Sequence, residues 1–75
     1  MNLVNSVQTN LAAATAERNR IEYSVWKRNM SDAAFPDDRT PYLRALGELM
    51  ELSERKRWRA ICITIEEIEK HVAQT

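Results

Sequence analysis

The sequence predicts an all-α fold. Its 75 residues include one glycine and two prolines, so few turns are expected, and residues that favour helices make up most of the remainder. Apolar residues recur every three or four positions along two long segments, and no useful stretch alternates polar and apolar residues as a strand would. A chain of this length is predicted to form a single helical domain over residues 1–75.

The first helix is predicted to run from about residue 4 to residue 30. One face of it carries an apolar stripe with helical spacing, formed by Val4, Val7, Leu11, Ala14, Ile21 and Val25. Arg18 falls within this stripe, so we expect its aliphatic stem to lie along a helix contact while its guanidinium group reaches water.

Residues 31–40 are predicted to connect the two helical segments. Phe35 precedes Pro36, which favours an extended backbone, and we expect the Phe35 ring to cover the end of a helical bundle. The pair Thr40 and Pro41 is typical of a helix start, with Thr40 as the N-cap and Pro41 in the first turn.

The second helical segment is predicted to span residues 41–73. Its apolar stripe comprises Leu43, Leu46, Met50, Trp58, Ile61, Ile65, Ile68 and Val72, which share one face if the helix is continuous. The polar run of residues 53–57 leaves a second interpretation open, because Ser53 could cap a new helix after a break near residues 52–53. We favour the continuous helix and therefore a long antiparallel helical hairpin.

Both segments also carry a second apolar stripe on another face. In the first segment this stripe comprises Ala12, Ala16, Tyr23, Trp26 and Met30. In the second segment it comprises Tyr42, Ala45, Leu49, Leu52, Ala60 and Ile63. A hairpin leaves these second stripes exposed, so we predict that two hairpins dimerise into a four-helix bundle. The alternative is a monomeric three-helix bundle, in which a break near Ser53 lets the third helix cover both stripes.

No residue set in the sequence indicates catalysis, a metal site or a cofactor. His71 is the only histidine, and a zinc-binding helix needs a second histidine and a further ligand. Cys62 is the only cysteine and is expected to be a small buried apolar residue rather than an activated thiolate. We therefore expect a protein that is not an enzyme and needs neither a metal nor a cofactor.

The charge balance and the ends of the chain predict a cytoplasmic protein. The 11 basic and 11 acidic residues cancel, so no general attraction to nucleic acid or to anionic lipid is expected. The first residues do not resemble a secretory signal, no apolar run is long enough to span a bilayer, and an unpaired cysteine fits a reducing compartment.

These observations favour a small protein–protein interaction module that acts as an adaptor, regulator or inhibitor of a larger protein. Chains of this size are common among phage and mobile-element products. The expected partners are a second copy and another, unidentified protein. The candidate partner-binding residues are Tyr23, Trp26, Met30, Leu49, Arg57, Trp58 and Arg59. The alternative is a nucleic-acid-binding regulator that uses the basic cluster of Arg55, Lys56, Arg57 and Arg59.

Overall fold

The computed structural model describes residues 3–30 and 33–73, with side chains from residue 6 onwards. Helix α1 spans Leu3–Met30, a 3-10 turn η1 spans Thr40–Tyr42, α2 spans Leu43–Leu49 and α3 spans Leu52–Ala73. The all-α prediction is confirmed for these residues. The side chain of Val4 and residues 31–32 of the predicted connector lie outside the described part of the chain.

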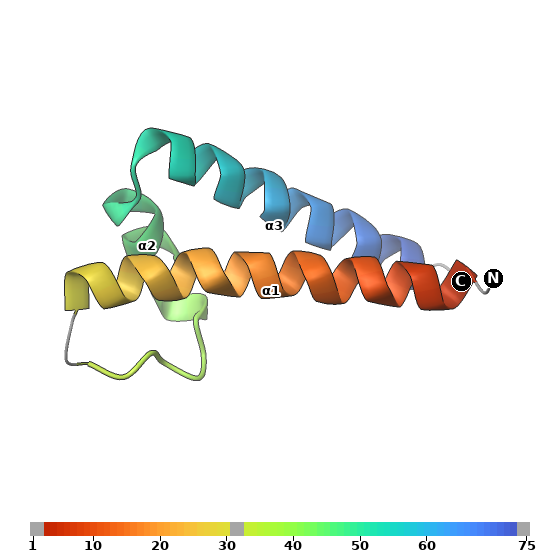
Figure 1. Ribbon diagram of the computed structural model, residues 1–75, viewed down its shortest axis with the longest axis horizontal. Helices are drawn as coiled ribbons and strands as arrows, with labels where there is room; N and C mark the ends of the chain where they lie inside the picture. Colours follow the sequence, from red (N-terminus) through yellow and green to blue (C-terminus); the bar gives the residue numbers. More distant parts are fainter. Residues whose placement is uncertain (1–2, 31–32, 74–75) are drawn as a thin grey trace.

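The two long helices run antiparallel, and α2 lies across one end of the pair (Figure 1). The molecule measures 43 × 24 × 20 Å, and α1 alone extends over about 42 Å at the usual helical rise. Its radius of gyration is 14.0 Å, whereas a compact domain of this length would have about 11 Å. The fold is therefore elongated, and much of each long helix has few neighbours.

The prediction of one continuous second helix is wrong, because the chain bends between α2 and α3. Met50 has an extended backbone (ψ 146°), and α3 begins at Leu52, just before the predicted position near Ser53. The backbone N–H of Glu51 donates to the Glu54 carboxylate at 3.4 Å, as in a capping box. The start of α3 is thus capped by Glu54 rather than by a serine side chain.

Arg55 stabilises the end of α2 at this bend. Its Nε donates to the Gly47 carbonyl oxygen at 2.7 Å, and its Nη2 donates to the carbonyl oxygens of Met50 at 3.2 Å and Glu48 at 3.5 Å. The last carbonyl groups of a helix have no partner within the helix, so a cation placed there satisfies them and also interacts favourably with the helix dipole.

Replacing Arg55 with alanine is expected to lower the free energy of unfolding by about 1.5–3 kcal/mol, the usual range for hydrogen bonds to a charged group. Urea denaturation followed by circular dichroism measures this loss. Lys56→Ala, next to it but exposed, is the matched control and should change stability by less than about 0.5 kcal/mol. Equal effects of the two substitutions would show that Arg55 does not hold α2.

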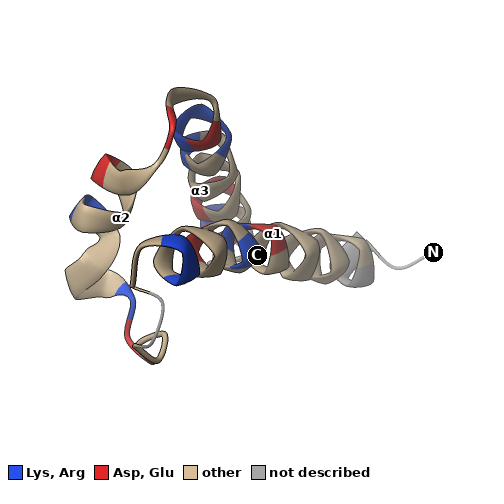
Figure 2. Cartoon of the chain, turned by 60° about the vertical axis from the view of Figure 1, so that its left-hand side comes forward, with Lys and Arg blue, Asp and Glu red and all other residues tan. Residues whose placement is uncertain are grey.

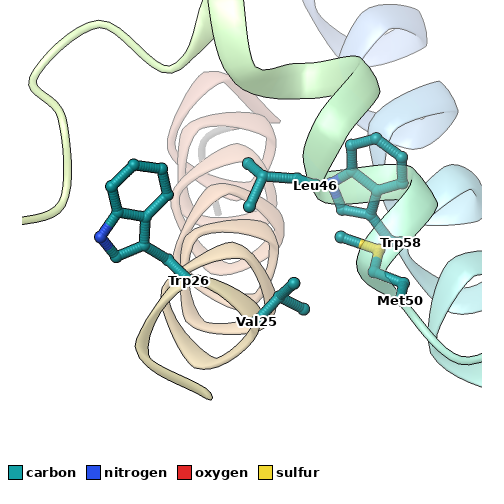
Figure 3. Packing of buried hydrophobic residues seen from close by; sticks show 5 residues of the cluster. All are labelled: Val25, Trp26, Leu46, Met50 and Trp58. Atoms are coloured by element: carbon teal, nitrogen blue, oxygen red, sulfur yellow. The ribbon is translucent and has the colours of Figure 1, made fainter. Parts of the chain in front are cut away.

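The hydrophobic core lies at the end of the molecule where all three helices meet. It consists of Val25 and Trp26 from α1, Leu46 from α2, Met50 from the bend and Trp58 from α3. Figure 3 shows Leu46 between the two tryptophans and Met50 beside Trp58. Ile21, Phe35, Leu43 and Cys62 pack against this cluster.

The first apolar stripes form the helix contacts, as predicted. On α1, Val25 is buried and the other described members, Val7, Leu11, Ala14 and Ile21, are half-buried. In the second segment the buried or half-buried members are Leu43, Leu46, Met50, Trp58, Ile61, Ile65 and Ile68. Val72, near the end of α3, is 46% exposed.

The connector matches the prediction at Phe35 but not at Thr40. The Phe35 ring packs edge-on against Trp26, with 5.8 Å between the ring centroids, and thus covers the end of the core as expected. Thr40 is the first residue of η1 rather than its N-cap, and no side chain caps that turn. Instead, Asp38 accepts a hydrogen bond from the Thr40 backbone N–H at 3.1 Å. Pro41 lies in the first turn, as predicted.

Candidate functional site

Among the described residues, a polar network surrounds the carboxylate of Glu22, which is fully buried on α1. Arg39 donates from Nε to Oε1 at 2.5 Å and from Nη2 to Oε2 at 2.7 Å, so the pair is bidentate. The indole Nε1 of Trp58 donates to the same Oε2 at 2.7 Å. One carboxylate therefore joins α1, the connector and α3 at the edge of the core.

In this network the negative charge of the Glu22 carboxylate is balanced by Arg39 and by hydrogen-bond donors. A buried carboxylate is costly unless it is paired and hydrogen-bonded, and Glu22 has three donors. The hydrogen bond to Glu22 raises the pKa of Arg39 above its ordinary value, against the opposing effect of burial. In the described part of the chain, every buried side-chain polar atom has a hydrogen-bond partner. Because both oxygens of Glu22 are occupied, its evident role is to hold three segments together.

Glu22 was not among the residues selected from the sequence. It lies one turn after Arg18 and next to Ile21, on the flank of the predicted apolar stripe. A single glutamate in that position usually faces water. The signal that could have identified it is a basic residue in the connector, Arg39, close enough to reach back to α1.

A groove of about 780 Å³ opens beside this network, between α2 and α3 and over α1. Trp58, Cys62 and Leu43 provide apolar surface in it. The charged residues that line it are Arg18, Arg39, Arg44, Arg55, Arg59, Glu48, Glu66 and Glu69. Most of these arginines are engaged, since Arg39 binds Glu22, Arg55 binds carbonyl groups and Arg44 pairs with Glu48 at 3.3 Å. The groove therefore has mixed charge rather than one dominant sign.

Cys62, a half-buried residue of this groove, is expected to react slowly with alkylating agents. Burial raises the pKa of its thiol, the nearby Glu22 carboxylate raises it further, and Arg39 and Arg18 oppose this shift. Since the thiolate is the reactive form, the rate of iodoacetamide labelling at pH 8 should be several-fold lower in the folded protein than in guanidinium chloride.

The raised pKa of Cys62 also sets the direction of a pH effect on stability. The folded state holds the thiol proton more tightly, so this contribution is present below the thiol pKa of the unfolded chain, about 8.5, and is lost as the pH rises through the folded pKa. A Cys62→Ala variant should show a smaller alkaline decrease in its unfolding free energy. An identical decrease in both proteins would contradict this assignment.

The candidate partner-binding residues occupy two kinds of environment. Trp26 and Trp58 are buried in the core, and their indole N–H groups donate to the Ala33 carbonyl oxygen and to Glu22. Tyr23, Met30 and Leu49 are 50%, 46% and 44% exposed. The structure therefore brings the two tryptophans into the core and leaves the other three apolar candidates on the surface.

The basic cluster at the start of α3 is divided among different contacts. Arg55 is engaged at the end of α2, and Arg57 pairs with Glu17 of α1 at 2.5 Å. Lys56 and Arg59 are exposed and have no ion pair within the described residues. Figure 2 shows acidic positions next to this basic stretch, at the bend before α3 and on α1.

The described residues contain no group of three or more His, Cys, Asp and Glu side chains that could hold a metal ion. His71 is exposed and lines a small surface depression together with Val7, Asn10 and Ile68. Among the same residues, none of the helices combines the length and the apolar character that crossing a membrane requires.

The fold and this polar network define the chain as a small three-helix protein. Comparison with protein-family models, with curated proteins and with solved structures finds no match to it.

Proposed function

We propose that this protein is a small cytoplasmic protein–protein interaction module that acts as an adaptor, regulator or inhibitor of a larger protein and has no enzymatic activity. The observation that carries the proposal is the exposure of the second apolar stripes. Of their members, only Trp26 is buried, and all the others are exposed. The alternative expectation, that three helices would cover both stripes, is wrong for this structure.

The reason for this exposure is the small size of α2. The bend separates only seven residues from α3, and they pack through one face, on which Leu46 is buried. The neighbouring side of α2 carries Ala45 and Leu49, both exposed. Tyr42 of η1, just before α2, is exposed as well, and Leu52 follows at the start of α3 with 65% of its surface exposed. Exposed apolar patches of this kind often mark protein-binding surfaces.

The surface at the α2–α3 bend is the one we assign to a foreign protein partner. Leu49 and Leu52 are its apolar centre. Lys56 and Arg59, which have no ion pair among the described residues, lie one and two turns further along α3. Tyr42 lies in η1, just before α2, and is held by its edge-on contact with Trp26, with 5.4 Å between the ring centroids. A rigid aromatic residue loses little conformational freedom when it is buried in an interface.

The experiment that tests this surface compares two variants in affinity capture from the native host. Leu49→Glu combined with Leu52→Glu should reduce recovery of a specific partner at least ten-fold without changing the thermal midpoint, because both side chains are exposed. Glu48→Gln, an exposed polar position on the same helix, is the matched control and should retain the partner. Equal capture by both variants would exclude this surface.

A nucleic-acid-binding regulator is the alternative, and the divided basic cluster supports it less well. Its test uses Lys56→Ala with Arg59→Ala, because Arg55 is needed by the fold and its replacement would confuse binding with stability. Retention of the wild-type protein on DNA or RNA at low salt, lost in this double variant, would favour the alternative. We expect no retention.

A further inference from the structure

The side of α1 opposite its contact with α3 is exposed and nearly free of charge. Its members recur at spacings of three, four and seven residues and are Thr9, Ala12, Ala16, Asn19, Tyr23 and Met30. We refer to them as the α1 outer face. The residues of α1 that pair with α3 lie elsewhere on the helix, since Glu17 binds Arg57 and Arg28 binds Glu54. The first charged residue of the whole chain is Glu17, so the beginning of this face is uncharged on its flanks as well.

The chain exposes more surface than its size requires. Its accessible surface is 5768 Å², whereas a compact monomer of 8.7 kDa would expose about 4,700 Å². The excess is about 1,000 Å², and each partner of a stable protein complex typically buries about 800 Å². One additional contact along a helix of this length would therefore bring the exposed area close to that of an ordinary small domain.

The pattern of the α1 outer face is self-complementary. When two copies of α1 pack antiparallel and cross near Asn19, Tyr23 of one copy faces Ala16 of the other, and Met30 faces Thr9. Large side chains then lie opposite small ones, which lets the two helices approach closely and fill the space between them. A parallel arrangement would instead place Tyr23 against Tyr23 and Ala16 against Ala16.

The charged residue Lys27, beside this face, is compatible with the antiparallel arrangement. Lys27 would lie opposite Ala12 of the other copy, where its aliphatic stem covers the alanine and its ammonium group reaches water. The Tyr23 ring is held on one side by Phe35, with 6.0 Å between the ring centroids, and half of its surface remains available. A tyrosine at such a position buries its ring and keeps its hydroxyl group at the edge of the contact.

We propose that the α1 outer face binds a second copy of the chain, with the two α1 helices antiparallel and related by a two-fold axis near Asn19. The inference goes beyond the proposed function, which concerns a foreign partner, and takes up the expectation from the sequence that a second copy is a partner. It leaves the α2–α3 bend free, so a dimer would present that surface twice.

The first experiment measures self-association. Multi-angle light scattering over about 5–500 μM protein should show a shift from the monomer to the dimer mass. Tyr23→Glu and Ala16→Glu should each weaken the dimer at least 100-fold, because each places a charge in the centre of an apolar contact. Ser24→Glu, exposed but outside the α1 outer face, is the matched control and should dimerise like the wild type. Circular dichroism shows whether each variant retains its helical fold.

The second experiment tests the orientation. In a Cys62→Ser background, proteins with Ala12→Cys and Lys27→Cys are mixed and oxidised, and a disulfide between the two different variants is expected to form faster than either symmetric disulfide. Faster symmetric disulfides would indicate parallel packing and overturn the proposal. If the dimer tolerates Tyr23→Glu and Ala16→Glu, the α1 outer face is not the dimer contact and the proposal is overturned. The protein would then associate with itself through another surface. A monomer at every concentration would remove the second copy as a partner and leave the test of Leu49 and Leu52 unaffected.

Discussion

Replacing Glu22 with glutamine is expected to destabilise the protein by about 3–5 kcal/mol, the range for removing one partner of a buried ion pair. Glutamine has nearly the same shape, but its amide nitrogen is a donor and cannot satisfy both Arg39 and Trp58, which donate to both carboxylate oxygens. A chain of this length has a total stability of about 4–11 kcal/mol. Glu22→Gln should therefore lose a large fraction of this stability, and urea denaturation followed by tryptophan fluorescence measures the loss.

Two further variants test whether the loss of stability comes from breaking the buried Glu22–Arg39 pair. Glu17→Gln removes the partner of Arg57, which is largely exposed, and should cost less than about 1 kcal/mol. Glu22→Leu combined with Arg39→Met removes both charges and should be more stable than Glu22→Leu alone, because no unpaired buried charge remains. If Glu22→Gln lies within about 0.5 kcal/mol of the wild type, the network does not hold the three segments together.

The apolar stripes could be predicted from the sequence because helical spacing alone decides which residues share a face. Leu46, Trp58 and Ile65 are buried for this reason, and Tyr42, Leu49 and Leu52, on the other face, are exposed. Periodicity is a local property, and it holds within each of the two segments whether or not they are joined by a continuous helix.

The bend and the buried network could not be predicted in the same way, because both depend on contacts between residues that lie apart in the sequence. The bend requires the guanidinium group of Arg55 to replace the helical hydrogen bonds of α2 and requires Gly47 beside Trp58, where a Cβ atom would come within 3.2 Å of the ring. Glu22 is separated from Arg39 by 17 residues and from Trp58 by 36. In the sequence, Glu22 and Arg39 have the character of ordinary solvated residues.

Because α2 likewise depends on contacts with residues outside it, we expect a large loss of stability when Leu46 is replaced with alanine. This residue is 1% exposed and is the buried residue of α2, a helix of seven residues. Helices this short are not stable in isolation, so α2 persists only through its contacts with the core and through Arg55. Leu46→Ala should lower the free energy of unfolding by about 2–5 kcal/mol and remove most of the amide exchange protection of residues 43–49.

Leu49→Ala is the matched control, because Leu49 lies three residues after Leu46 on the same helix and is 44% exposed. It should cost less than about 1 kcal/mol and leave exchange protection of α2 unchanged. Both variants should also weaken the binding of a foreign partner, for different reasons. Leu46→Ala should weaken it by releasing α2, and Leu49→Ala by removing a contact from a helix that is still in place. If Leu46→Ala binds the partner as well as the wild type, the surface at the α2–α3 bend does not need an ordered α2, and the partner must be recognised elsewhere.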